Sequence, residues 1–245
     1  MADVAASAPR ISLRLLVDDE RHGPLPILLL GLTILTGLVD AVSILSLGRV
    51  FVANMTGNVV FIGFALAGAP GFSLAASVSA LVGFLVGAGF GGHLVTLWRS
   101  HRGRLLLAGS SVELVCVSAA LVMVAVAPTH LPHGLQDATA AVLGGALGTQ
   151  NAMVRGLGVP DLTTTVLTMT LTGLVADVRS GFGPTSLRRL LAVVTMFGGA
   201  FLGATLVLKV SPTAALGLAV GLLVAVVVGA GVLSRGERPW HRPAG

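Results

Sequence analysis

Two short polar stretches interrupt an otherwise apolar sequence, one at residues 51–58 and the other at residues 163–172. The side chains that they offer are those of Asn54, Thr56, Asn58, Thr168 and Thr170. Amide and hydroxyl groups in such surroundings can bind a polar solute, or they can bond only neighbouring helices and their own backbone. As a group, these residues predict the lining of a polar cavity.

Asp40 and Glu113 are ionisable groups that lie inside apolar runs. At the centre of a bilayer such a group costs at least about 2.5 kcal/mol unless it faces a cavity or a partner. Either carboxyl could therefore act as a proton carrier. The alternatives are a structural hydrogen bond to a neighbouring helix and a pairing with Arg49 or Arg155. Asn151, whose place in the second half of the chain matches that of Asp40, completes the predicted solute-binding set.

Signatures of catalysis, metal binding and nucleic-acid binding are missing from the sequence. It contains no Walker loop and no cluster of His, Cys and Asp at metal-ligand spacing, and its six histidines fall mainly in loops and tails. The single cysteine, Cys116, lies in an apolar run and permits no intramolecular disulfide. The sequence also lacks the combined aromatic and basic surface that binds nucleic acid. We therefore expect no catalytic residues, no metal, no cofactor and no nucleic-acid partner.

The composition identifies the elements that must position these groups as membrane helices. Hydrophobic residues make up 54% of the 245 residues and charged residues only 10%, and the mean hydropathy is +0.95. So few charges could not cover the surface of a soluble protein. Several apolar runs, such as residues 105–127 and 212–233, reach the roughly 20 residues that cross about 30 Å of hydrocarbon. The sequence predicts an all-α, polytopic membrane protein whose first span, near residues 26–47, is not a cleaved signal peptide.

The second half of the chain repeats features of the first. Aligning the halves so that Gly87 falls on Gly199 also superposes the two polar stretches, and moving this alignment by a single position places Asp40 on Asn151. Sequence rich in Gly, Ala, Val and Leu also generates chance matches, so the repeat is a prediction for the structure to test. The predicted segments are a cytoplasmic N-terminal segment at residues 1–24, repeat 1 at residues 25–127, an extracytoplasmic linker at residues 128–134, repeat 2 at residues 135–234, and a short, polar, disordered cytoplasmic tail at residues 235–245.

The distribution of basic residues favours one topology over another. If all eight apolar runs crossed the membrane, the basic loop at residues 99–104 would face outside and the uncharged loop at residues 128–134 would face inside, against the positive-inside rule. If each polar stretch enters and leaves on the same side, the basic loops and both termini become cytoplasmic. Each half then holds three full spans and one interrupted, re-entrant helix, and because three is odd the halves have opposite orientations. Secondary transporters use inverted repeats of this kind, with the substrate site near the midplane where the breaks meet.

Small and basic residues suggest further contacts. Gly83, Gly87 and Gly91 follow one another at four-residue spacing, which lets another helix approach closely and could support a homo-oligomer. The basic residues at 99–104 are expected to anchor the chain at the headgroups of the lipid bilayer. Helix starts at the two breaks would expose unpaired N–H groups, which suit an anionic or dipolar solute.

Three motifs carry a family resemblance. They are Gly-Leu-Val-Asp-Ala at residues 37–41, Phe-Val-Ala-Asn-Met-Thr-Gly-Asn at residues 51–58 and Gly-Thr-Gln-Asn-Ala at residues 148–152. With these motifs the chain resembles the YoaK family, bacterial integral membrane proteins that are assigned as a domain of unknown function. The resemblance implies a multi-span protein of the bacterial plasma membrane. It implies no substrate and no activity.

The leading hypothesis is therefore a transporter or channel-like permease for an unidentified small solute, with its site at the paired helix breaks near the bilayer midplane. Two alternatives stay open. One is a membrane scaffold or partner subunit that assembles through the glycine face, and the other is an intramembrane enzyme. Eight full spans with parallel halves are the alternative topology.

Overall fold

The computed structural model describes residues 21–127, 131–165, 167–180, 183–235 and 239–241, and within these ranges its regular structure is entirely helical. The helices are α1 (Leu25–Ser46), α2 (Met55–Leu66), α3 (Leu74–Leu97), α4 (Arg102–Ala125), α5 (His133–Leu157), α6 (Thr168–Ser180), α7 (Pro184–Lys209), α8 (Pro212–Leu233) and the 3₁₀ turn η2 (Pro239–His241). The predicted all-α class is confirmed.

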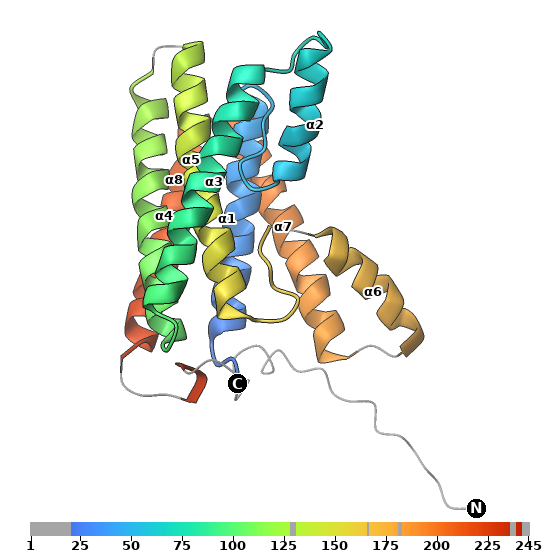
Figure 1. Ribbon diagram of the computed structural model, residues 1–245, viewed down its shortest axis with the longest axis vertical. Helices are drawn as coiled ribbons and strands as arrows, with labels where there is room; N and C mark the ends of the chain where they lie inside the picture. Colours follow the sequence, from blue (N-terminus) through green and yellow to red (C-terminus); the bar gives the residue numbers. More distant parts are fainter. Residues whose placement is uncertain (1–20, 128–130, 166, 181–182, 236–238, 242–245) are drawn as a thin grey trace, which may run out of the picture.

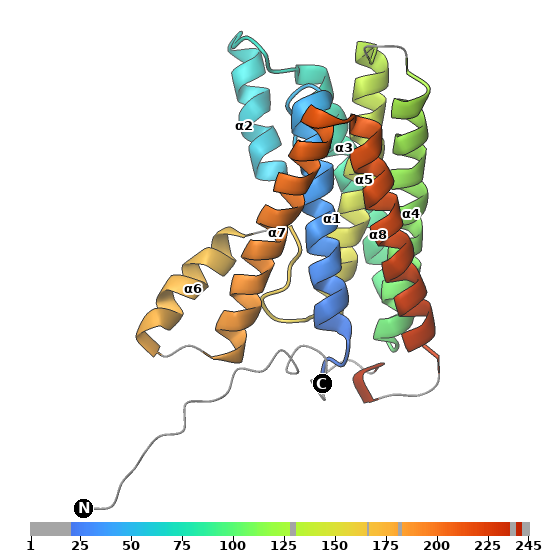
Figure 2. The same ribbon diagram turned by 180° about the vertical axis from the view of Figure 1, so that it is seen from behind.

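Six long helices form an elongated bundle (Figures 1 and 2). Of these, α1, α3, α4, α7 and α8 are long and apolar enough to cross a membrane. The sixth, α5, is 25 residues long but more polar, and it packs against α1, α3 and α4. The chain is therefore a multi-pass membrane protein whose most polar spanning helix is shielded by its neighbours.

Local chemistry fixes where the long helices begin and end. Ser73 and Ser211 accept hydrogen bonds at the starts of α3 and α8, from the backbone N–H groups of Ala76 and Ala214. At the end of α5, Gly158 adopts the left-handed conformation, with φ of 61°, that closes a helix most easily when no side chain is present.

The helices α2 and α6 do not cross the membrane. They have 12 and 13 residues, which is well short of the roughly 20 that a span needs. In Figure 1 the chain leaves the upper end of α1, turns back to mid-height and returns upward through α2. At the lower end it leaves α5, rises to mid-height and returns downward through α6. Both elements are re-entrant, as predicted, and the alternative of eight full spans is wrong.

The two halves pack as an inverted repeat. The helices α1 and α5 run in opposite directions (Figure 1), and the contact of α1 with α7 is matched by the contact of α5 with α3. The match extends to single residues: a Cβ added at Gly87 would lie 2.0 Å from the carbonyl oxygen of Gly145, and one added at Gly199 would lie 2.2 Å from that of Ile34. Gly87 aligns with Gly199, and Ile34 aligns with Gly145 when the alignment is moved by one position, so the repeat predicted from the sequence is confirmed.

The glycine face of α3 is covered within the chain. A Cβ at Gly83 would lie 2.1 Å from the carbonyl oxygen of Ala141, and one at Gly91 would lie 2.8 Å from the Cβ of Ala152. Gly87 contacts the same helix, α5, so all three glycines serve a helix pair inside the molecule. The surface that the sequence offered to a second copy is therefore already occupied.

Two segments at the lower end are more ordered than the sequence suggested. Arg102 is only 4% exposed and donates from Nε to the carbonyl oxygen of Leu157 at 3.0 Å, so it caps the C-terminus of α5 instead of reaching lipid headgroups. In the tail, Trp240 and His241 of η2 are buried, and the His241 ring stacks on that of His101 at 4.3 Å. Residues 239–241 of the tail therefore belong to the folded unit.

Candidate functional site

The first helix break is held by two side chains that bond its backbone. Oδ1 of Asp40 in α1 accepts hydrogen bonds from the backbone N–H groups of Val52 and Ala53, both at 3.2 Å. Asn58 in α2 makes a reciprocal pair with Phe51, because its Oδ1 accepts from the Phe51 N–H at 2.9 Å and its Nδ2 donates to the Phe51 carbonyl at 2.6 Å. Extended backbone at membrane depth needs such partners. Asp40 and Asn58 thus hold the loop in this conformation.

The glycine of the Met-Thr-Gly-Asn motif makes room for this arrangement. A Cβ at Gly57 would lie 2.5 Å from the ring of Phe51, so a larger residue would displace the ring from the start of α2. Asn54 and Thr56 are exposed, and Asn54 occupies the N-cap position without a side-chain cap bond. Neither residue is among those that line the cavities described below.

The second break is held by side-chain contacts. Nε2 of Gln150 in α5 donates to the hydroxyl oxygens of Thr36, at 3.0 Å, and of Thr164, at 2.8 Å. Nδ2 of its neighbour Asn151 donates to the hydroxyl oxygen of Thr165 at 2.8 Å. Through these two bonds, Gln150 links the second break to α1 of the first repeat. The sequence prediction missed it, although it directly precedes Asn151 in a motif that had been singled out.

Unusual backbone angles mark both loops. Arg49 and Asp161 stand at equivalent places and have φ values of 59° and 64°. Thr164 has a φ of 61°, which is rare for a β-branched residue and costs on the order of 1–3 kcal/mol. Its bond to Gln150 helps to hold this conformation, so the second break stores backbone strain beside the centre of the bundle.

Thr168 and Thr170 have different surroundings. Thr168 begins α6 and is exposed, and its carbonyl accepts the hydroxyl of Thr172 at 2.9 Å. Thr170, the counterpart of Asn58, is only 4% exposed. The structure therefore brings Asn151 and Thr165 together at the second break, but it leaves Thr168 at the surface.

Glu113 is buried in α4 without a hydrogen-bond partner for either carboxyl oxygen among the described residues. The hydroxyl of Ser110, one turn away, is also buried and unpartnered within the described chain. Gly109 packs against Met153 of the antiparallel helix α5, so Glu113 lies at about the level of Gln150. The proposed pairing of Asp40 or Glu113 with Arg49 or Arg155 is wrong, since no ion pair joins them in the part of the chain that the structure covers.

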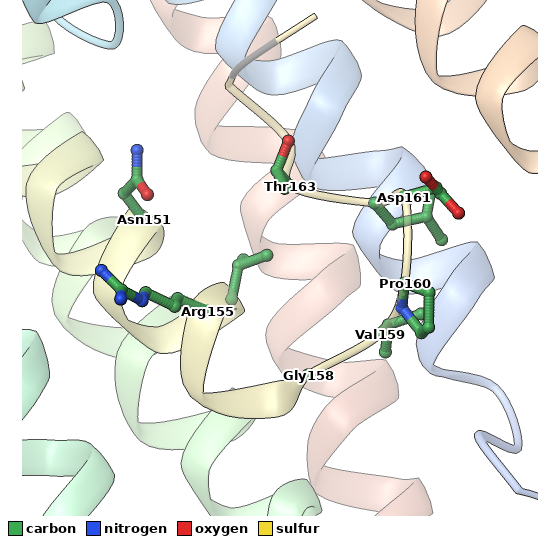
Figure 3. A pocket seen from close by; sticks show the side chains of 9 residues that line it. Asn151, Arg155, Gly158, Val159, Pro160, Asp161 and Thr163 are labelled. Carbon is green, nitrogen blue, oxygen red and sulfur yellow. The ribbon is translucent and has the colours of Figure 1, made fainter. Parts of the chain in front are cut away.

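Three cavities lie beside the breaks. The loop cavity, about 470 Å³ and shown in Figure 3, lies between the end of α5 and the loop that follows, and it is lined by Asn151, Val154, Arg155, Gly158, Val159, Pro160, Asp161, Leu162 and Thr163. The α3–α5 cavity, about 580 Å³, is lined by Phe84, Ala88, Gly92, Val95, Asn151, Ala152, Arg155 and Gly156. The α1–α7 cavity, about 330 Å³, is lined by Gly37, Asp40, Ala41, Ile44, Leu45, Phe51, Met196, Ala200 and Ala204.

The α3–α5 and α1–α7 cavities are equivalent in the two repeats. Within the linings Ala88 aligns with Ala200, and Asp40 aligns with Asn151 when the alignment is moved by one position. The main chemical difference is that Arg155 stands where the first repeat has Ile44. The sequence prediction treated Arg155 only as a potential ion-pair partner, so it missed this residue as a site candidate.

An ion-pair cluster borders the loop cavity. Arg189 of α7 donates from Nε to Asp161 and from Nη1 to Asp177 of α6, both at 2.8 Å. The Asp161 carboxylate is therefore engaged by Arg189, and in Figure 3 it lies across the cavity from Arg155. Among the described residues no group of three or more His, Cys, Asp or Glu side chains is placed to hold a metal ion.

The comparisons with known proteins agree with this architecture. A family described as protein of unknown function (DUF1275) matches residues 28–229. The chain is also similar to the UPF0700 transmembrane protein YoaK of Bacillus subtilis (strain 168), with 34% identity over 158 residues, or 61% of this chain. That alignment spans 66% of the relative, which is just under two thirds of its length. No solved structure matches the chain.

Proposed function

The chain belongs to the DUF1275 family of membrane proteins of unknown function, and from its geometry we propose that it is a transporter or channel-like permease for a small solute. The site is the pair of helix breaks with the cavities beside them. The observation that carries the proposal is the inverted repeat with a re-entrant element and a cavity at equivalent places in each half. Secondary transporters are built in this way because irregular backbone at membrane depth must line a cavity or be buried in protein.

The positions of the equivalent cavities fit alternating access. In Figure 1 α1 runs upward and α5 runs downward, and Asp40 and Asn151 both lie toward the C-terminal ends of their helices. The two cavities therefore lie on opposite sides of the midplane. The bond between Gln150 and Thr36 joins α5, which lines one cavity, to α1, which lines the other. Movement of one repeat against the other could open each cavity to its own side in turn.

Asp40 and Glu113 are the proposed proton carriers. Asp40 bonds the loop through a carboxylate oxygen, so a proton on it would weaken the hold on Val52 and Ala53. Glu113 is a buried carboxyl without a partner in the described chain, and its charged form is costly there. If movement of the repeats changes the protonation of either carboxyl, proton transfer is coupled to transport.

We propose that the protein lies in the bacterial plasma membrane and that both of its termini are on the cytoplasmic side. The end at which α1 begins carries the basic residues between α3 and α4 and at the start of α7, whereas Lys209 lies at the other end. The test uses single cysteines at Ser100 and Gly134 after replacement of Cys116. We expect an impermeant reagent to label Gly134→Cys, and not Ser100→Cys, in intact cells; labelling of Ser100→Cys would overturn the orientation.

The function is tested by flux into proteoliposomes with a panel of small carboxylates, amino acids and sugars. We expect flux of at least one solute, a fall to background for Asp40→Asn and Asn58→Ala, and loss of stimulation by a proton gradient for Glu113→Gln. Each variant must elute as a folded, monodisperse species before its flux is interpreted. Unchanged flux in both break variants would remove the proposed site.

The scaffold alternative has lost its main support, because α5 covers the glycine face on which it depended.

We also propose that the chain is not an enzyme. If it were, purified protein in detergent would turn over a lipid or peptide with every gradient collapsed.

A further inference from the structure

We propose that the α3–α5 cavity binds the carboxylate of a small organic monoanion, with Arg155 and Asn151 as the anion-binding groups and the α3 wall as the surface for its hydrocarbon part. The inference rests on the proposed function in taking this cavity as the solute site. It adds the chemical class of the solute and the residue that selects it.

Arg155 lies in the cavity and has no described partner that would prevent it from binding an anion. It lies one turn after Asn151 on the same face of α5, as Figure 3 shows, and both residues line the α3–α5 cavity. Among the described residues Arg155 makes no hydrogen bond and no ion pair. Asn151 donates one N–H to Thr165, so its second N–H remains for a ligand. A guanidinium and an adjacent amide form a favourable pair of donors for a carboxylate.

The nearby carboxylates do not neutralise this arginine. Asp161 and Asp177 both bond Arg189 at 2.8 Å. Asp161 borders only the loop cavity, where its charge disfavours an anion, and the lining of the α3–α5 cavity includes no acidic residue. An anion is therefore bound favourably on only one side of Arg155, the side that faces α3.

The rest of the lining selects an organic body. Phe84, Ala88 and Val95 present hydrocarbon, and Gly92 leaves room, since a Cβ there would meet nothing within 4 Å. A volume of about 580 Å³ is large enough for a small organic molecule. An inorganic phosphate would satisfy Arg155 but would leave its other oxygens facing an apolar wall, which is unfavourable.

The equivalent cavity shows that this chemistry belongs to one repeat. Ile44 stands in place of Arg155 and Asp40 in place of Asn151, so the α1–α7 cavity combines an apolar wall with a carboxylate. An anion is repelled there. A solute that crossed between the cavities would thus be held on one side and released on the other.

The experiment measures binding by isothermal titration calorimetry in nanodiscs of phosphatidylcholine. The probes are hexanoate and benzoate, with hexanamide, hexylammonium and inorganic phosphate as comparisons. We expect both carboxylates to bind at least about tenfold more tightly than the other probes, since one charge-assisted contact distinguishes them. Arg155→Gln should lose at least about tenfold in carboxylate affinity, and Arg155→Lys should recover part of it. Arg99→Gln, which removes an exposed charge near the same end, should leave binding unchanged.

Each outcome decides the inference. Equal binding of hexanamide, or carboxylate binding that survives Arg155→Gln, overturns it. If nanodiscs with phosphatidylglycerol block hexanoate through Arg155, the occupant is a lipid headgroup and the solute assignment fails. Arg155-dependent binding without flux supports the inference and overturns the transport function, whereas flux that ignores solute charge and Arg155 supports transport and overturns the inference. The melting temperatures of Arg155→Gln and Arg155→Lys establish that both are folded.

Discussion

The two helix breaks have the same architecture but are held by different chemistry. In the first repeat the carboxylate of Asp40 bonds two backbone N–H groups, and Asn58 bonds both the N–H and the carbonyl of Phe51. In the second repeat the amides of Gln150 and Asn151 bond threonine hydroxyls. The first arrangement satisfies backbone groups that have no other partner among the described residues, so its loss should cost more than loss of the second.

The re-entrant helices also differ in how they are attached to the rest of the protein. The helix α2 ends among aromatic rings, with Phe61 and Phe72 at 5.0 Å and Phe64 and Phe72 at 5.3 Å between centroids. The helix α6 is joined to α7 by Arg189 and Asp177, whose side chains are about one fifth exposed, at 19% and 22%. Ring packing is insensitive to salt, whereas a partly exposed ion pair is screened by it. The comparison teaches that a repeated fold can keep one break firm and make the other responsive to its surroundings.

The largest expected effect distinguishes Asp40 from its counterpart. Asp40→Ala leaves two buried N–H groups without an acceptor, and we expect it to lower the free energy of unfolding by about 2–5 kcal/mol. Asn151→Ala removes one side-chain bond and should cost only about 1 kcal/mol. Thermal unfolding in one detergent, followed by the loss of the monodisperse species, measures both. Equal losses would mean that the two breaks are held equally.

Gly87 and Gly199 occupy equivalent helix contacts in the two repeats, so substitutions at them should have similar effects. Gly87→Ala and Gly199→Ala each force a Cβ against a backbone carbonyl, at 2.0 and 2.2 Å, and should cost similar amounts of about 1–3 kcal/mol. Gly89→Ala is the control, because a Cβ there meets nothing within 4 Å and should gain up to about 1 kcal/mol from helix propensity. The same unfolding assay applies. A large loss at one glycine and none at the other would break the predicted equivalence of the helix pairs.

The sequence predicted the fold better than it predicted the hydrogen bonds. Apolar runs, their lengths and the placement of basic residues were enough to predict the re-entrant elements and the inverted repeat. The partner of a polar side chain depends on tertiary packing, which is why Asp40 could be singled out but its bonds to Val52 and Ala53 could not. Arg102 illustrates the same limit, since it caps α5 at Leu157, 55 residues away. Arg155 was overlooked because an arginine near a span end is normally explained by topology alone.

A smaller effect is expected where the second repeat has a residue with no polar equivalent in the first. Gln150 aligns with Val39 when Asn151 is placed on Asp40, so its bonds to Thr36 and Thr164 exist on one side only. Gln150→Leu should lower the free energy of unfolding by about 1–2 kcal/mol and release Thr164 from its strained conformation. Hydrogen exchange should then accelerate at residues 163–165 and stay unchanged at residues 51–53. Acceleration at both loops would show that the breaks are coupled instead of held separately.

The smallest effect tests how each re-entrant helix is held. Arg189→Gln removes the charge that joins Asp161 and Asp177, and it should increase backbone hydrogen exchange in α6 by a few fold without changing α2. In the unmodified protein, raising the salt concentration toward about 1 M should produce the same change, because the screening length falls to about 3 Å. Phe72→Leu is the matched variant for α2, and it should loosen that helix at every salt concentration. If α2 responded to salt as strongly as α6, the two halves would share one mode of attachment, and the asymmetry between them would lie in the cavities alone.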